Sequence, residues 1–237
     1  MKDKRKIGKF GWRVEVDLEG GRIVSLMKDE EGILGSFERM DGKMGNTHVC
    51  IPNFAAEGVE KFGFVFHGPF RNSRWQVVNQ ADDSLEVKCE IEGLEVVQKF
   101  QVGRQGFSHK IVVTNNTGER KRVNAAVHNY WETKYGWQGT KLNGVDITEG
   151  FKTNPEIRLK KENLLEFPGQ KAIFWRVENF KVVKLWTGFR EENREKIYDQ
   201  KYVCLEPVME REGFVETDKS WLEAGGKIEL GQEIDLG

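Results

Sequence analysis

The hydrophobic pattern of this sequence repeats with a short period, and this feature limits its fold more than any other. Apolar and polar residues alternate in many short segments, which are separated by turn-forming residues such as Gly, Asn and Asp. Alternation of this kind is typical of β-strands that bury one face. No long window carries apolar residues at i, i+3, i+4 and i+7, as an amphipathic helix would. The pattern therefore predicts an all-β protein built from two large antiparallel sheets packed face to face.

The expected strands follow from the positions of the alternating segments. In chain order they are 12–16, 23–26, 62–66, 75–78, 85–91, 94–102, 110–114, 123–130, 145–148, 172–177, 180–186, 201–205 and one or two between 220 and 236. Asn115 to Gly118 supply the turn between 110–114 and 123–130, because Asn and Gly tolerate positive φ. Residues 45–58 contain Pro52 and several Gly and Asn residues, so this segment is expected to be a loop.

Length and charge exclude several classes of protein. A chain of 237 residues can bury one substantial core, and no linker or repeat is visible, so a single domain spanning 1–237 is predicted. The 37 basic and 38 acidic residues balance, which argues against nucleic acid or an anionic membrane as partner. The sequence has no run of about 18 apolar residues and no signal-peptide h-region. We therefore expect a cytoplasmic monomer or homodimer.

The cysteines and histidines give no sign of a metal site. Cys50, Cys89 and Cys204 are odd in number and form no CxxC pair, which predicts reduced thiols. The residues show no metal-ligand spacing, and the chain has no Gly-rich phosphate loop, so neither a metal nor an organic cofactor is predicted. His48 and His109 have no motif around them, and structural roles are expected for both.

One predicted strand, 123–130, has an unusual face. Val123, Ala125 and Val127 point to one side and form ordinary core. The opposite side carries small or polar residues and one aromatic, namely Asn124, Ala126, His128 and Tyr130. This second face can line a cavity, and it makes His128 a candidate for chemistry.

Six segments of the chain occur in the order that is known from one protein family. They are GGRIVSL, GNTHVCIPNF, FHGPFRNSRW, VTNNTGERKRVNAAVHNYW, VVKLWTG and YVCLEPV. With them the chain resembles the aldose 1-epimerase (galactose mutarotase-like) family from about Gly20 to Leu230. The resemblance implies a β-supersandwich fold and a small-molecule sugar as ligand. The segments KVVKLWTG and YVCLEP are more similar to the branch containing glucose-6-phosphate 1-epimerases, which would make that ligand a sugar phosphate.

The resemblance also implies roles for individual residues. His128 corresponds to the general acid of the family and Glu206, in VCLEP, to its general base. His67 and Arg71, in HGPFR, correspond to residues that contact the substrate. From the residues alone His67 could instead cap the turn at Gly68–Pro69, and Arg71 could form surface ion pairs.

Tryptophans are further candidates for the site, and two departures keep another function open. Trp131 and Trp186 could stack on a sugar ring, although core packing is the usual role of any single tryptophan. Trp131 stands where the family usually has Phe, and Thr187–Gly188 replaces the usual Asn–Pro. A non-catalytic carbohydrate-binding protein on the same fold is therefore the alternative to an epimerase. A glycosidase or lyase is a third, and it would need a second carboxylate near Glu206, for which the chain offers Glu132, Asp146 and Asp199.

The chemistry of anomer interconversion explains why a histidine and a carboxylate would be needed. The sugar ring opens when one group removes the proton from the C1 hydroxyl while another protonates the ring oxygen. After rotation about the C1–C2 bond the same transfers run backwards. A carboxylate with an ordinary pKa of about 4.3 and an imidazole with one of about 6.5 can perform both transfers without a cofactor.

Overall fold

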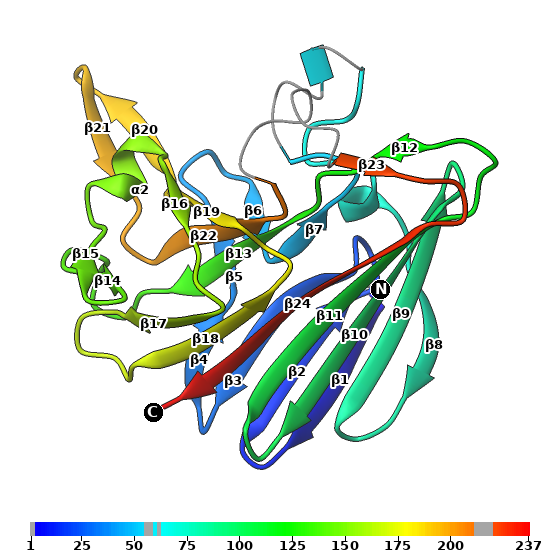
Figure 1. The fold of residues 1–237 in the computed structure, drawn as a ribbon. Helices are drawn as coiled ribbons and strands as arrows, with labels where there is room; N and C mark the ends of the chain where they lie inside the picture. Colours follow the sequence, from blue (N-terminus) through cyan, green and yellow to red (C-terminus); the bar gives the residue numbers. More distant parts are fainter. Residues whose placement is uncertain (1–2, 55–58, 61–62, 211–219) are drawn as a thin grey trace.

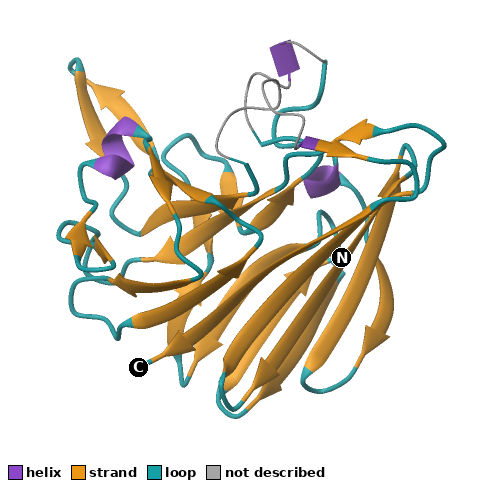
Figure 2. Ribbon diagram, in the orientation of Figure 1, coloured by secondary structure: helices purple, strands orange, loops and turns teal. Residues whose placement is uncertain are grey.

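The computed structural model describes residues 3–54, 59–60, 63–210 and 220–237, and strands dominate it (Figures 1 and 2). The strand β10 (Leu94–Gly103) shows how the alternation builds a sheet. Leu94, Val96, Gln98, Phe100 and Val102 are buried, whereas the residues that alternate with them are exposed or partly exposed. Each such strand lays one apolar row against the opposite sheet.

The first sheet has the order β1-β2-β3-β4-β13-β22-β19-β16, and β7 also pairs with β13. Every neighbouring pair in it is antiparallel. Its strands are β1 (Lys4–Lys9), β2 (Trp12–Asp17), β3 (Arg22–Lys28), β4 (Glu31–Leu34), β7 (His48–Cys50), β13 (Ala126–Glu132), β16 (Glu156–Arg158), β19 (Val182–Trp186) and β22 (Tyr202–Val208).

The second sheet has the order β15-β14-β17-β18-β24-β11-β10-β9-β8 and is also antiparallel. Besides β10 its strands are β8 (Gln76–Gln80), β9 (Ser84–Ile91), β11 (Gly106–Asn115), β14 (Lys141–Leu142), β15 (Val145–Asp146), β17 (Glu162–Glu166), β18 (Ile173–Glu178) and β24 (Lys227–Leu236).

Short ribbons and two single helical turns complete the described part. The ribbons are β5–β6 (Ser36–Glu38, Met44–Asn46), β12–β23 (Lys121–Arg122, Trp221–Leu222) and β20–β21 (Phe189–Glu192, Glu195–Tyr198). The helical turns are η1 (Phe70–Asn72) and α2 (Gly150–Thr153). Among the residues described, no helix has the length and apolar character to cross a membrane.

The main core lies between the two large sheets, and it fixes which face of β13 is turned inward. Trp131 of β13 packs edge-to-face against Trp175 of β18, with ring centroids 5.5 Å apart. Beside them Asn129 Nδ2 donates to Gln232 Oε1 (2.9 Å) and Gln232 Nε2 donates to Asn129 Oδ1 (3.1 Å). Because side chains alternate along a strand, His128 and Tyr130 point to the other face of the first sheet.

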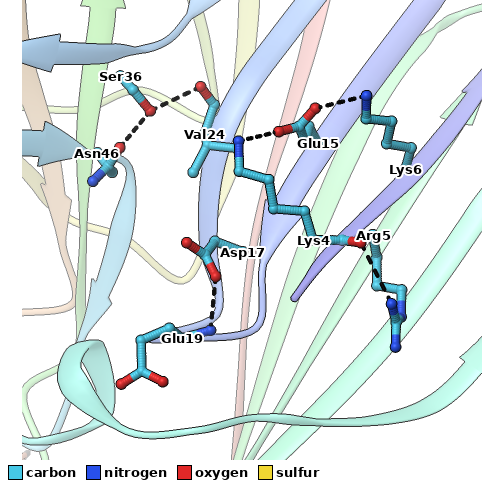
Figure 3. A network of polar contacts seen from close by, with 9 residues as sticks. All are labelled: Lys4, Arg5, Lys6, Glu15, Asp17, Glu19, Val24, Ser36 and Asn46. Atoms are coloured by element: carbon cyan, nitrogen blue, oxygen red, sulfur yellow. Dashed lines mark hydrogen bonds and ion pairs between the residues drawn. The ribbon is translucent and has the colours of Figure 1, made fainter. Parts of the chain in front are cut away.

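The predicted fold class is confirmed, because the chain forms two large antiparallel sheets with almost no helix. Most predicted strands are present, including those at 85–91, 94–102, 110–114 and 201–205. The strand β1 was not expected, since Ile7 is its one apolar residue. It forms because Ile7 is buried, and because Lys4 and Lys6 pair with Glu15 of β2 (Figure 3).

Two local predictions are wrong. Residues 63–66 form no strand, and Phe62 lies outside the described residues. The Phe residues at alternate positions there belong to a connection that ends in a turn at His67 and Gly68, both of which have positive φ. The segment 45–58 was expected to be a loop, but it contains the end of β6 and all of β7, while 55–58 lie outside the description. Strands of three residues are too short to show a periodic pattern.

Candidate active site

One row of side chains crosses four strands of the first sheet and carries most of the titratable groups of the site. The register pairs His48 of β7 with His128 of β13, and Lys184 of β19 with Glu206 of β22. β13 and β22 are antiparallel and pair Asn129 with Leu205. One step further along this register, His128 lies opposite Glu206. Directly opposite residues share a face, so the whole row lies on the face turned away from the main core.

His128 and Glu206 are in contact, as the predicted catalytic pair requires. The distance from His128 Nδ1 to Glu206 Oε2 is 3.4 Å, and the two side chains are only 7% and 4% exposed. The contact is not aligned as a hydrogen bond, so both ring nitrogens and Oε2 have no hydrogen-bond partner among the described residues. Buried polar atoms without partners are costly and uncommon, which favours a ligand-binding role for these groups.

Burial shifts the pKa values of the two groups in opposite directions. Removal from water raises the pKa of Glu206 to about 8, with the charge of Lys184 acting against this rise. Removal from water also lowers the pKa of His128 well below its ordinary value, and the neighbouring histidines and arginines lower it further. The resting pair therefore holds one proton, on the carboxyl group, and the imidazole is neutral.

The turn before η1 brings His67 and Arg71 next to this pair. The ring centroid of His67 lies 5.2 Å from that of His128. The turn depends on Gly68, whose φ is +73° and where a Cβ would lie 1.7 Å from the Ile51 carbonyl oxygen. His67 Nδ1 contacts Cys50 Sγ at 3.4 Å, so its side chain points into the site and does not cap the turn.

Hydrogen bonds fix the backbone of Arg71, while the Nε atom of its guanidinium has no hydrogen-bond partner among the described residues. Its carbonyl oxygen accepts hydrogen bonds from Arg22 Nε (2.9 Å) and Nη2 (2.5 Å), which fix η1 against β3. Its own Nε is buried without a hydrogen-bond partner in the described part of the chain. The positive charge of Arg71 also lowers the pKa of His67 after the larger effect of burial. Arg71 thus places a positive charge near the three histidines of the site.

His48 belongs to the site although a structural role was expected for it. Its Nδ1 donates to the Asn46 carbonyl oxygen at 2.6 Å, and its ring stacks on His128 with a centroid distance of 5.0 Å. Asn46 is itself held by Ser36, whose hydroxyl also bonds to the Val24 carbonyl at 3.0 Å (Figure 3). His48 stands in GNTHVCIPNF, a segment that carries the resemblance, and that was the one signal available in the sequence.

An aromatic cluster forms another wall of the site. Tyr130 stacks on His128 at 4.8 Å, and Trp186 meets the same imidazole edge-on at 6.1 Å. The Arg39 guanidinium lies over the Trp186 ring, 5.0 Å from its centroid. Trp186 is partly exposed, so this residue of the cluster is accessible from outside the protein.

The prediction that Trp131 contacts the sugar is wrong. Its side chain is 0% exposed and packs in the main core against Trp175 and Phe167. Trp131 is three residues from His128 along the same strand, so alternation sends the two side chains to opposite faces. The indole serves the packing of the two sheets.

The fold brings together potential metal ligands that are far apart in the sequence. One ligand atom from each of His48, Cys50 and His128 can be chosen so that all three lie within 4.8 Å of one another. The same holds for His128, Cys204 and Glu206. The mixture of nitrogen, sulfur and carboxylate oxygen suits a borderline-soft cation.

The comparisons with known proteins identify the fold. No family model matches the sequence, and a search of curated proteins finds no match. A galactose mutarotase-like protein from Lactobacillus casei has a TM-score of 0.77 at 13% identity, covering 99% of this chain and 100% of that one. A suspected aldose 1-epimerase from Escherichia coli K12 gives 0.76 at 16% identity, over 100% and 99% of the two chains. A 4-alpha-glucanotransferase from Thermococcus litoralis gives 0.66 at 11% identity, over 99% of this chain but 37% of that one. The chain thus has the galactose mutarotase-like fold, as its sequence predicted.

Proposed function

We propose that this protein is an aldose 1-epimerase, which interconverts the α and β anomers of a hexose or hexose 6-phosphate. The observation that carries the proposal is the contact of His128 with Glu206, 3.4 Å apart, both buried and both without hydrogen-bond partners in the described structure. The likeness to proteins described as mutarotase-like or as a suspected aldose 1-epimerase supports it at the level of the fold.

In the proposed reaction Glu206 removes the proton from the C1 hydroxyl and His128 donates one to the ring oxygen. The ring opens, the C1–C2 bond rotates, and the reversed transfers close the ring on the other face. A pyranose cannot fit between two groups in contact, so the sugar must lie across the outer edge of the pair. This is compatible with the chemistry, because the two oxygens that exchange protons are bonded to the same carbon.

The reactive form carries the proton of the pair on His128. Burial favours the alternative in which Glu206 holds it, and the short separation allows one transfer between them. A hydroxyl that binds at Glu206 would stabilise the carboxylate and so favour the reactive form. Each positioned proton-transfer group is expected to contribute roughly 10²–10⁴ in rate.

Three further residues would hold the substrate. Trp186 offers an aromatic face beside His128, and His67 offers a ring nitrogen to a sugar hydroxyl. Arg71 offers guanidinium N–H groups that suit a hydroxyl or a phosphate. A hexose 6-phosphate is preferred over the free hexose if Arg71 meets the phosphate.

The test is to measure anomer exchange directly. Polarimetry follows fresh α-D-glucose and α-D-galactose, and exchange NMR follows glucose 6-phosphate. Purified protein is expected to accelerate at least one of them, and Glu206→Gln and His128→Asn are each expected to lower the rate by ~10²-fold or more. Glu233→Gln, at an exposed carboxylate of β24, is the matched control. Acceleration of none of the three by folded protein would overturn the proposal.

A second candidate is a carbohydrate-binding protein without turnover. One observation favours it, namely the structural match of 99% of this chain to 37% of a larger glucanotransferase. The fold therefore also occurs as one part of a bigger enzyme. Calorimetry distinguishes the two functions. Saturable sugar binding that Trp186→Leu weakens, without faster anomer exchange, would favour binding alone.

A further inference from the structure

Three imidazoles and a thiol converge beside the proposed catalytic pair. The ring centroids of His48, His67 and His128 are separated by 5.0 Å (His48–His128), 5.2 Å (His67–His128) and 5.9 Å (His48–His67). Cys50 Sγ lies 3.4 Å from His67 Nδ1. Four residues of types that bind transition metals are therefore grouped in one buried place.

The spacing of the His48 and His128 rings is that of two imidazoles on one tetrahedral zinc ion. Zn–N bonds of about 2.1 Å and tetrahedral angles place the centroids of imidazoles on one zinc ion about 5.2 Å apart. Two of the three observed separations, 5.0 and 5.2 Å, are close to this value, and the third is 5.9 Å. Ligand atoms of His48, Cys50 and His128 already lie within 4.8 Å of one another.

The hydrogen-bonding surroundings of the two stacked histidines are those expected around metal ligands. His48 Nδ1 must carry the proton, because it donates to a carbonyl oxygen, that of Asn46. This leaves the lone pair on Nε2, which is buried and has no partner among the described residues. His128 Nδ1 faces Glu206, which leaves its Nε2, also buried and unpartnered. Zinc-bound histidines commonly have a carbonyl or a carboxylate at the other ring nitrogen in this way.

We propose that His48, Cys50 and His128 form a zinc site, with two imidazole nitrogens and one thiolate around a single Zn²⁺ ion. Three protein ligands leave the fourth tetrahedral position to water, as in zinc sites that stay open to a further ligand. On binding, the Cys50 S–H bond breaks, the sulfur keeps the electron pair and forms the Zn–S bond, and the proton leaves to solvent. Thiolate and imidazole ligands select zinc over magnesium or calcium.

The charges around the site set how strongly the ion is held. Arg39 and Arg71 act electrostatically on all three histidines and oppose a dication. The thiolate that Cys50 forms on binding zinc offsets part of their charge. A bound zinc ion also occupies the His128 lone pair, so the loaded protein would be inactive as an epimerase. This consequence alone rests on the proposed function.

The binding test needs no sugar. The protein is treated with EDTA, dialysed, and titrated with Zn²⁺ in competition with a chromophoric chelator, and in parallel with Co²⁺ followed by absorption. We expect one tightly bound zinc ion per chain, and a cobalt spectrum with tetrahedral d–d bands and a thiolate charge-transfer band. Cys50→Ser and His48→Gln should each weaken zinc binding by more than ~100-fold, the upper end of the cost of losing an outer-shell partner. Cys89→Ser removes another buried thiol, on the second sheet, and should change nothing.

The outcomes separate this proposal from the epimerase proposal. No stoichiometric zinc on folded wild-type protein, an octahedral cobalt spectrum, or equal effects of Cys50→Ser and Cys89→Ser would each overturn the zinc site. The first two readouts do not depend on whether variants fold poorly, because they are made on the wild-type protein. If the protein also accelerates anomer exchange, zinc should abolish the acceleration and EDTA should restore it. Full activity of the zinc-loaded protein would refute the assignment of His128 as a ligand.

Discussion

The replacement of Glu206 by Gln should make the protein more stable by an amount that grows with pH. The native carboxyl keeps its proton up to a pKa of about 8, whereas in the unfolded chain it loses it near 4.5. Between these values the unfolded state binds fewer protons, so the free energy of unfolding of the wild type falls as pH rises, by about 1.4 kcal/mol per pH unit. Gln is close to Glu in shape and has no such proton.

The expected gain follows from that slope. Near pH 4.5 wild type and Glu206→Gln should be similar in stability. At pH 7 the gain is at most about 3 kcal/mol, and at pH 9 at most about 5 kcal/mol. These are upper limits, because water that enters beside an ionised carboxylate reduces the cost of burying it. The contributions of the other titrating groups to the free energy of unfolding cancel in this difference, because the two proteins differ at one residue.

Urea unfolding followed by tryptophan fluorescence at pH 5, 7 and 9 measures the difference. Glu233→Gln, at an exposed carboxylate, should show no trend with pH. The same Glu206→Gln protein should lose epimerase activity, so that a gain in stability accompanies a loss of function. A difference that does not change with pH, or a variant less stable than wild type at pH 9, would refute the reasoning about the buried carboxyl group.

Three further predictions concern pH, the aromatic residues and the turn. Activity should fall above pH about 8 in a plot of log kcat/KM against pH, because the His128–Glu206 pair then loses the proton that it shares; a flat profile to pH 10 would contradict this. Trp186→Leu should raise KM by about tenfold in steady-state kinetics, because the variant loses the aromatic face. Trp131→Phe should leave KM unchanged but should lower the free energy of unfolding by about 1–3 kcal/mol in urea unfolding. Gly68→Ala should lower stability by more than ~1 kcal/mol in the same unfolding assay, because a Cβ there would lie 1.7 Å from a carbonyl oxygen; wild-type stability would contradict the strained turn.

The sequence predicted those parts of the fold that depend on local pattern. Long alternating strands such as β9 and β10 were predicted close to their observed bounds, because their apolar residues alternate along almost the whole length, whereas the prediction of 110–114 covered only the second half of β11. β7 could not be found in this way, because its three residues, His48 to Cys50, are all buried. Register between strands that are distant in the chain is also invisible in the sequence, so His48 could not be placed opposite His128.

The alternation of side chains along a strand would have placed Trp131 correctly. Alternation alone puts Trp131 on the same face as Val127, which was assigned to the core. The proposed role in sugar stacking did not take this alternation into account, since a separation of three residues puts the side chains of Trp131 and His128 on opposite faces. The catalytic assignments rested on the resemblance, and the structure adds the contact between His128 and Glu206 that no pattern could supply.

The two proposals make opposite demands on His128, and Glu206 distinguishes them. Proton transfer needs a free Nε2 and a carboxylate that can exchange a proton with the substrate, whereas zinc needs the Nε2 lone pair and uses Glu206 only as an outer partner. Replacing Glu206 by Gln should therefore abolish anomer exchange but weaken zinc binding by no more than ~10–100-fold, the cost of an outer-shell change. Replacing Cys50 by Ser should weaken zinc binding by a far larger factor. If Glu206→Gln instead eliminated zinc binding while Cys50→Ser left it intact, the carboxylate would itself be a ligand, and the ion would belong to the set formed by His128, Cys204 and Glu206.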